Sequence, residues 1–177
     1  IQTRPAKNRI ARFAERKSAQ FINGDLKIGK LQGNFFTHLE LENVLLTIEE
    51  DTIAYIKEFS VQYNLWSLFS NTIDIHKAVI NEPFVHLKQV NDTSWNVQKI
   101  LKPLPEEPDT AKPPDIEIYL PQFQIKEGSI RITAADTMIP KAIKNLNTEI
   151  ALVWSGNKQQ SLHLKEFSFY AIKPDLH

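Results

Sequence analysis

Apolar residues recur at every second position over most of the chain after Gly24, and this period of two predicts β-strands. Ile73 and Ile75 show the pattern, and so do Ile130 and Ile132. A strand with one apolar face has to bury that face against another part of the fold or against a ligand. The usual solution is a sandwich of two sheets. The other solution is a single curled sheet whose apolar side stays uncapped.

Turn signals divide the pattern into short strands that follow one another as an antiparallel meander. Leu65 to Phe69 reads as a short helical or irregular piece, Pro83 separates two strands, and Trp95 to Leu101 has room for two helical turns. A further turn is expected near Glu127 and Gly128. The predicted strands cover 26–31, 39–48, 53–63, 73–79, 85–87, 116–125, 130–132, 150–154 and 162–169.

The segment before the strands has helical spacing instead. Residues 5–21 lack glycine and place Ile10, Phe13 and Phe21 near one face, and Asn23-Gly24 is a typical helix stop. We therefore predict a basic amphipathic helix over 1–22.

This predicted helix carries an excess of five positive charges, although the chain as a whole is neutral. Such a helix either lies solvated against the fold or contacts anionic lipid head groups. Its basic residues are Arg4, Lys7, Arg9, Arg12, Arg16 and Lys17.

Five of the ten prolines fall between residues 102 and 115, a composition typical of an extended connection. The expected organisation is therefore a helix over 1–22, a first sheet segment over 23–102, a Pro-rich connection over 103–115 and a second sheet segment over 116–177. The two sheet segments are expected to be continuous with each other.

Composition excludes several classes of function. Balanced charges, 21 basic against 21 acidic, give no field that would attract nucleic acid. The absence of cysteine removes disulfides, thiolate metal sites and cysteine nucleophiles. Five glycines occur without a phosphate-binding spacing, and the apolar runs are far shorter than the roughly 20 residues of a membrane span.

Side chains that carry chemistry are scattered. No two histidines stand at metal-ligand spacing, although His76 and His86 could approach each other on neighbouring strands. Carboxylates cluster at 49–51 and 106–109, in a turn and in the Pro-rich connection, where solvation does not favour acid–base catalysis. We therefore predict no catalytic group, no metal site and no cofactor, and the chain does not read as an enzyme.

Five short motifs occur in an order that resembles the AsmA-like superfamily, and its TamB proteins in particular. The likeness covers about residues 20 to 101, and a looser second instance runs from Leu120 to Ile132. The motifs are IGKLQG at 28–33, LELENV at 39–44, YNLWSL at 63–68, IDIHKAVINEPFVHL at 73–87 and WN at 95–96.

The resemblance implies a mainly β fold with an N-terminal α-helix, in which a curled antiparallel sheet forms an open hydrophobic trough, the β-taco. It implies a periplasmic protein of a diderm bacterium, held in the inner membrane by an anchor before Ile1. It further implies a BamA-type outer-membrane barrel, such as TamA, as a partner of a C-terminal region beyond His177.

The function expected from this resemblance is to shield phospholipid acyl chains in a groove between the inner and outer membranes. One alternating row from each strand would line that groove. The candidate lining residues are Ile28, Leu39, Leu41, Ile53, Phe59, Val61, Tyr63, Ile73, Ile75, Val85, Leu87, Ile116, Ile118, Ile130, Ile132, Ile150 and Leu152.

Two other functions stay open at the level of sequence. The first is a scaffold or assembly factor that offers sheet edges to outer-membrane protein clients by β-augmentation. The second is a sugar-binding sandwich that uses Trp66, Trp95 and Trp154 as exposed platforms.

Overall fold

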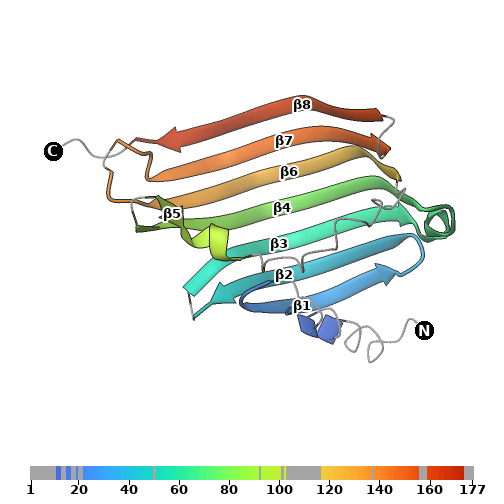
Figure 1. Cartoon of the computed structure of the whole chain (residues 1–177), viewed down its shortest axis with the longest axis horizontal. Coiled ribbons are helices and arrows are strands. Elements are labelled where there is room, and N and C mark those ends of the chain that lie inside the picture. Colours follow the sequence, from blue (N-terminus) through green and yellow to red (C-terminus); the bar gives the residue numbers. More distant parts are fainter. Residues whose placement is uncertain are drawn as a thin grey trace, which may run out of the picture.

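A single curled sheet makes up almost all of the structure (Figure 1). The computed structural model describes residues 11–12, 15–16, 19, 22–49, 51–91, 93–100, 102, 117–136, 138–155 and 159–173. The strand order is β1-β2-β3-β4-β6-β7-β8, and the short β5 pairs with the end of β4. The sheet does not close, since β1 and β8 are its two edges.

The strands are long, and two short 3₁₀ helices connect some of them. The helices are η1, Leu65–Ser70, and η2, Asn96–Lys99. The strands are β1 (Asp25–Asn34), β2 (His38–Ile48), β3 (Asp51–Asn64), β4 (Thr72–Asn91), β5 (Ser94–Trp95), β6 (Glu117–Thr133), β7 (Ala142–Ser155) and β8 (Gln159–Ile172).

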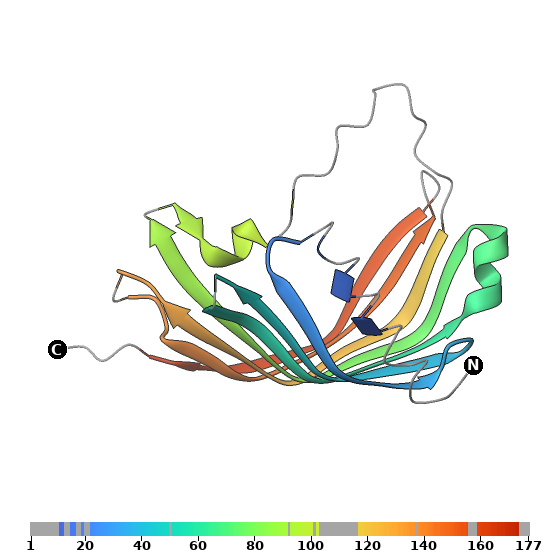
Figure 2. The same cartoon turned by 90° about the horizontal axis from the view of Figure 1, so that it is seen from below.

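The prediction of a curled, mainly antiparallel sheet is confirmed, with one correction. β4 and β6 pair in parallel, with Val79 opposite Gln124 and Val85 opposite Ile130, so the meander is interrupted there. Parallel neighbours need a crossover that returns the chain to the starting end of the first strand. β5 and η2 form the start of this return, on the concave side of the sheet (Figure 2).

Two predicted strand breaks are wrong. β4 runs for 20 residues through Pro83, and β6 runs for 17 residues through Gly128. The helical piece expected at 65–69 is present as η1, whereas 95–101 holds only the single turn of η2. What looked like turns in the sequence are therefore bends inside continuous strands.

These bends lie on one line across the sheet. Asn43, Glu82, Glu127 and Asn145 all adopt a positive φ, between 47° and 55°. The pairings of Glu42 with Glu58, Glu58 with Asn81, and Asn81 with Lys126 place these positions side by side in successive strands. We call this line the crease, and Figure 2 shows the strands curving up on both sides of the middle of the sheet.

The crease also changes which residues point to which face. Residues directly opposite each other across two strands share a face. Leu41 pairs with Phe59, and beyond the crease Val44 pairs with Ile56, so the apolar face moves from odd-numbered to even-numbered residues in β2 and β3. The change of face in β2 and β3 therefore keeps their apolar side chains on one side of the sheet.

Close packing at the crease explains a glycine in β1. The pairs Ile28–Val44 and Lys30–Glu42 place Gly29 opposite Asn43. A Cβ atom on Gly29 would lie 2.9 Å from the Cβ of Asn43. Any larger residue would force the two strands apart at this point.

Two of the expected segments lie largely outside the described residues. Of the predicted helix over 1–22, the description covers Arg12 and Arg16 but not Arg4, Lys7, Arg9 or Lys17. The Pro-rich connection over 103–115 lies wholly outside it. The first and second sheet segments belong to one sheet, because β4 pairs with β6.

Glu127→Val is expected to lower the free energy of unfolding by about 1–2 kcal/mol, because a β-branched residue is strained at the positive φ of this position. Glu127→Gly should leave stability unchanged or raise it, since glycine has no such strain. Urea denaturation checks both variants. Lys126→Val, at the preceding strand position, is the control. Equal losses of unfolding free energy in Lys126→Val and Glu127→Val would contradict the backbone strain inferred for residue 127.

Candidate functional site

The concave face carries unbroken rows of apolar side chains that cross the sheet from strand to strand. One row runs over all seven main strands and consists of Leu31, Leu41, Phe59, Ile80, Ile125, Thr148 and Phe167. The next row toward η1 consists of Leu39, Val61, Ala78, Phe123, Ile150 and Leu164. Thr148 is the one polar member, and its hydroxyl donates a hydrogen bond to the carbonyl of Glu166 at 2.9 Å.

Further rows extend the apolar surface toward both ends of the strands. Beyond the crease, a row of seven contains Leu26, Leu46, Ala54, Val85, Ile130, Ile143 and Ala171. On the side of η1, shorter rows contain Tyr63 with Ile75, Leu120 with Leu152 and Leu162, and Ile73 with Ile118 and Trp154.

The position of η1 identifies this apolar face as the concave one. Leu65 and Leu68 of η1 line a hollow of about 200 Å³ together with Val61, Ile73 and Ile75. Figure 2 shows η1 at the concave side of the sheet, beyond the ends of β3 and β4. The apolar rows therefore face into the curve.

No second layer of strands covers this face within the described part of the chain, since β1–β8 form a single sheet. Among the same residues, no large side chain is completely buried. In a two-sheet sandwich the inward rows would form a close-packed core. The described strands thus form one sheet and not the two packed sheets of a sandwich.

Most of the predicted lining residues fall on these rows. Ile28 joins the row of Val44, Ile56 and Pro83, and Leu87 pairs with Ile132 at the far end. Ile53 differs because it lies at an irregularity opposite Leu46 and Thr47 and is only 3% exposed, which leaves little surface for a ligand. Ile116 lies outside the described residues.

Sequence reasoning missed about as many residues of this face as it found. The missed positions include Leu31, Val44, Ile56, Ile80 and Phe123. A fixed alternation through Ile53, Tyr55 and Phe59 hid the change of face at Lys57. The usable signal is a pair of consecutive polar residues in mid-strand, namely Glu42-Asn43, Lys57-Glu58, Asn81-Glu82 and Lys126-Glu127.

Three of these polar pairs point to the convex side together. Lys57, Glu58, Asn81, Glu82, Lys126 and Glu127 line one hollow of about 280 Å³, which requires consecutive residues to share a face. Lys57 donates a hydrogen bond to Glu82 within this hollow. The outer side of the bend is therefore polar and the inner side apolar.

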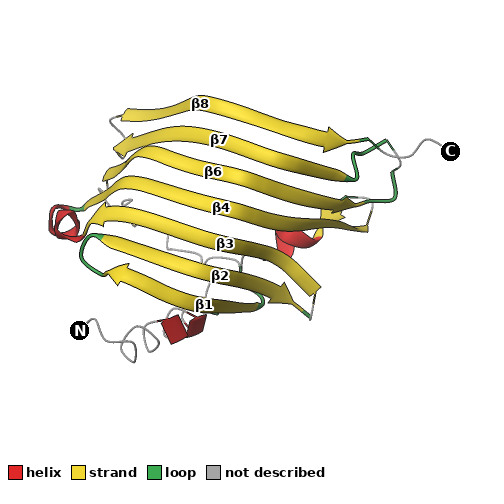
Figure 3. Ribbon diagram, turned by 180° about the vertical axis from the view of Figure 1, so that it is seen from behind, coloured by secondary structure: helices red, strands yellow, loops and turns green. Residues whose placement is uncertain are grey.

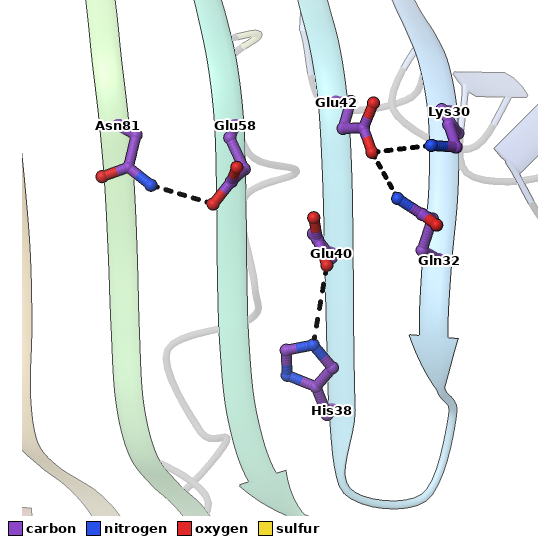
Figure 4. Close-up of polar contacts among 7 residues, drawn as sticks. All are labelled: Lys30, Gln32, His38, Glu40, Glu42, Glu58 and Asn81. Atoms are coloured by element: carbon purple, nitrogen blue, oxygen red, sulfur yellow. Dashed lines mark hydrogen bonds and ion pairs between the residues drawn. The ribbon is translucent and has the colours of Figure 1, made fainter.

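Cross-strand polar contacts continue over the convex face (Figure 4). Glu42 and Glu58 are direct neighbours, and each accepts a hydrogen bond from a different donor, Lys30 at 2.9 Å and Asn81 at 2.9 Å. Gln32 also donates to Glu42. Exposed pairs of this kind contribute little to stability, about 0–1 kcal/mol each. They keep the convex face polar, and they give the neighbouring carboxylates of Glu42 and Glu58 separate donors.

Among the described residues, three side chains have perturbed pKa values, and they lie apart from one another on β3 and β7. The hydrogen bond to Glu82 raises the pKa of Lys57. Burial raises the pKa of Tyr63, whose hydroxyl donates to the carbonyl of Phe35 at 2.5 Å. Hydrogen bonds from Gln124 and Lys165 lower the pKa of Glu149.

The histidines on β4 lie far from each other. His76 and His86 belong to the same strand, ten positions apart, so the possibility that they approach each other on neighbouring strands is not realised. At about 3.3 Å per residue they are about 33 Å apart. In the described part of the chain no group of three His, Asp or Glu side chains could hold a metal ion.

Comparison with models of protein families, with curated proteins and with solved structures finds no match. In the residues covered by the description, no helix is long and apolar enough to cross a membrane.

Glu149 predicts a dependence of stability on acid pH. The pKa of Glu149 in the folded protein lies below its ordinary value of 4.5. The contribution of this carboxylate to the free energy of unfolding is therefore fully present above about pH 4.5, and it is lost as the pH falls through the pKa of the folded state. Glu149→Gln should therefore flatten the fall of unfolding free energy below about pH 4.5. Glu166→Gln, on the neighbouring strand, is the control, and an unchanged slope in Glu149→Gln would contradict the assignment.

Proposed function

We propose that this chain shields the acyl chains of phospholipids in an open trough, as one segment of a lipid path between two membranes. The observation that carries the proposal is the concave face, on which no second sheet lies within the described strands and whose mostly apolar rows cross the sheet from β1 to β8. The motif order that resembles AsmA-like proteins supports the same function.

The energetics explain why a trough of this kind is sufficient. Exposing one CH₂ group to water costs about 0.8 kcal/mol, so two acyl chains of ordinary length cost on the order of 20 kcal/mol to move through water. A continuous apolar surface removes most of that barrier without a catalytic group or a metal ion. The charged head group can stay in solvent, because the trough is open along one side.

The cross-section also suits an acyl chain. Eight residues of a strand span about 26 Å and place about four side chains on one face. The strands β3, β4, β6, β7 and β8 are all longer than that. The crease lets these long strands curve around a lipid instead of lying flat beneath it.

Under this proposal the chain would act in the periplasm, anchored in the inner membrane by a segment before Ile1. The lipid would leave through a further region that contacts an outer-membrane barrel of the BamA type. Both statements rest on the resemblance of the motifs, and the basic residues of segment 1–22 would then lie next to the inner membrane.

A charge on the concave face tests the proposal. Val61→Glu is expected to weaken the binding of a fluorescent fatty acid at least about tenfold, because a carboxylate would face hydrocarbon. Gln62→Glu is the matched control, since the adjacent residue lines the opposite face with His38 and His76. Circular dichroism establishes that both variants are folded.

Mass spectrometry of organic extracts supplies the second arm of this test. Phospholipid should co-purify with the wild-type chain and with Gln62→Glu, and should be depleted in Val61→Glu. Equal lipid in all three folded proteins would refute the trough as the binding surface.

A scaffold for outer-membrane proteins is a second candidate, and the exposed edge strand β8 favours it. Leu162, Leu164, Phe167 and Phe169 are exposed on this strand, and only β7 pairs with it. An extended client peptide could add to β8 by β-augmentation. If a peptide from an outer-membrane barrel strand binds equally well to the wild-type chain and to Val61→Glu, the scaffold function is supported. Failure of such peptides to bind would exclude it.

A further inference from the structure

An exposed aromatic cluster stands beside the concave face at one end of the strands. We call it the aromatic tip, and it consists of Phe36, Trp66, Leu68 and Phe69, which are 47%, 64%, 51% and 85% exposed. The Trp66 ring stacks between Phe36 and Phe69, with centroid distances of 6.4 and 5.9 Å. The tip combines η1 with the turn between β1 and β2.

Hydrogen bonds hold these two segments together. The amide of Leu65 donates to the carbonyl of Phe36 at 3.3 Å, and the amide of Tyr63 donates to the carbonyl of Thr37 at 2.9 Å. The Tyr63 hydroxyl adds its bond to Phe35. The aromatic side chains are therefore presented on an anchored platform.

Charge is missing from the tip and from its surroundings in the sequence. No Asp, Glu, Lys or Arg occurs between Phe59 and Ile73 or between Gly33 and Thr37. The fifteen uncharged residues from Phe59 to Ile73 cover the end of β3, η1 and the start of β4. A solvent-facing turn is usually polar or charged, so an uncharged stretch that exposes Trp and Phe needs a physical reason.

The backbone of η1 is satisfied from within. The Asn64 side chain accepts a hydrogen bond from the amide of Trp66 at 3.1 Å, and the Ser70 hydroxyl donates to the carbonyl of Ser67 at 2.9 Å. The Ser67 hydroxyl lies 2.7 Å from the carbonyl of Asn64 and 2.9 Å from that of Thr72. The amide of Asn71, which adopts a positive φ, closes the helix on Leu68.

We propose that the aromatic tip docks on a lipid bilayer and inserts Trp66 and Phe69 at the boundary between head groups and acyl chains. Trp is enriched at this boundary, and a segment that enters it has to satisfy its backbone polar groups internally. The tip has both properties. Its lack of charge makes neutral lipid sufficient, in contrast to an electrostatic anchor.

A protein partner fits the tip less well. A stable protein interface buries about 800 Å² on each side and usually has a polar rim with hydrogen bonds. The tip offers four side chains, and the side-chain hydrogen bonds of Asn64, Ser67 and Ser70 are already used inside it. An apolar solvent layer matches this surface better than a second folded surface does.

The tip also connects to the trough. Leu68 belongs to the tip and lines the apolar hollow with Val61 and Ile75, so a docked tip would place the start of the apolar rows next to the bilayer. This role in loading rests on the proposed function, whereas the docking itself does not.

Flotation with vesicles tests the docking. The double variant Trp66→Ser, Phe69→Ser should reduce partitioning onto phosphatidylcholine vesicles at least about tenfold relative to the wild-type chain. Met138→Ser is the matched control, because Met138 is an exposed apolar residue in the connection between β6 and β7, and it should partition like the wild type. Equal partitioning of the double variant and the wild type overturns the proposal.

Fluorescence gives an independent readout. In a chain with Trp95→Phe and Trp154→Phe, the remaining Trp66 should shift its emission to the blue and be quenched by brominated lipid on neutral vesicles. An emission spectrum that does not change on vesicles overturns the proposal. So does a change of oligomeric state in the double variant with unchanged vesicle binding, which would identify the tip as a contact between copies.

The two proposals fail separately. Val61→Glu should lose fatty-acid binding and keep vesicle docking, whereas Trp66→Ser, Phe69→Ser should lose docking and keep the binding of fatty acid presented in solution. Docking that requires anionic lipid and disappears at high salt would assign membrane contact to the basic segment and overturn the role of the tip.

Discussion

The structure depends on one constraint, which is that the sheet has to bend in mid-strand without turning its apolar side chains outward. A residue at positive φ in β2, β4, β6 and β7 bends the chain, and it also adds one position that restores the direction of the next apolar side chain. The cost of such a residue, on the order of 1 kcal/mol for a residue other than glycine, recurs in strand after strand. The polar pairs that occupy the outside of the bend, such as Lys57-Glu58 and Asn81-Glu82, keep that side in water.

The described strands place no second sheet on the apolar face, and this changes what the side chains have to do. In a sandwich, Phe59 and Ile80 would interlock with a facing sheet and contribute mainly to stability. Here they line a concave surface that stays accessible, so stability has to come from the backbone ladder and from contacts between neighbouring side chains. Figure 3, which views the sheet from behind, shows how continuous that ladder is from β1 to β8. The same side chains therefore hold the sheet together and form its concave surface.

Sequence patterns predicted the strands and about half of the apolar face, because alternation depends only on neighbouring residues. A short helical or irregular piece is predicted at 65–69, where η1 lies. The patterns failed at Pro83 and at Glu127-Gly128, which read as chain reversals but lie inside β4 and β6. A bend and a reversal use the same residue types, and only the register with the neighbouring strand separates them. The parallel pairing of β4 with β6 was unpredictable for a similar reason, since local periodicity carries no information on which strand becomes the neighbour.

The crease gives the sheet a modular geometry. β2, β4, β6 and β7 each carry a residue of positive φ near one line of the sheet, so the profile of the curve is set within single strands. A polypeptide that adds strands with a polar pair at this position would extend the sheet in steps of about 4.8 Å and leave the curve of each strand unchanged. Duplication of strands would therefore enlarge the concave face without changing its profile.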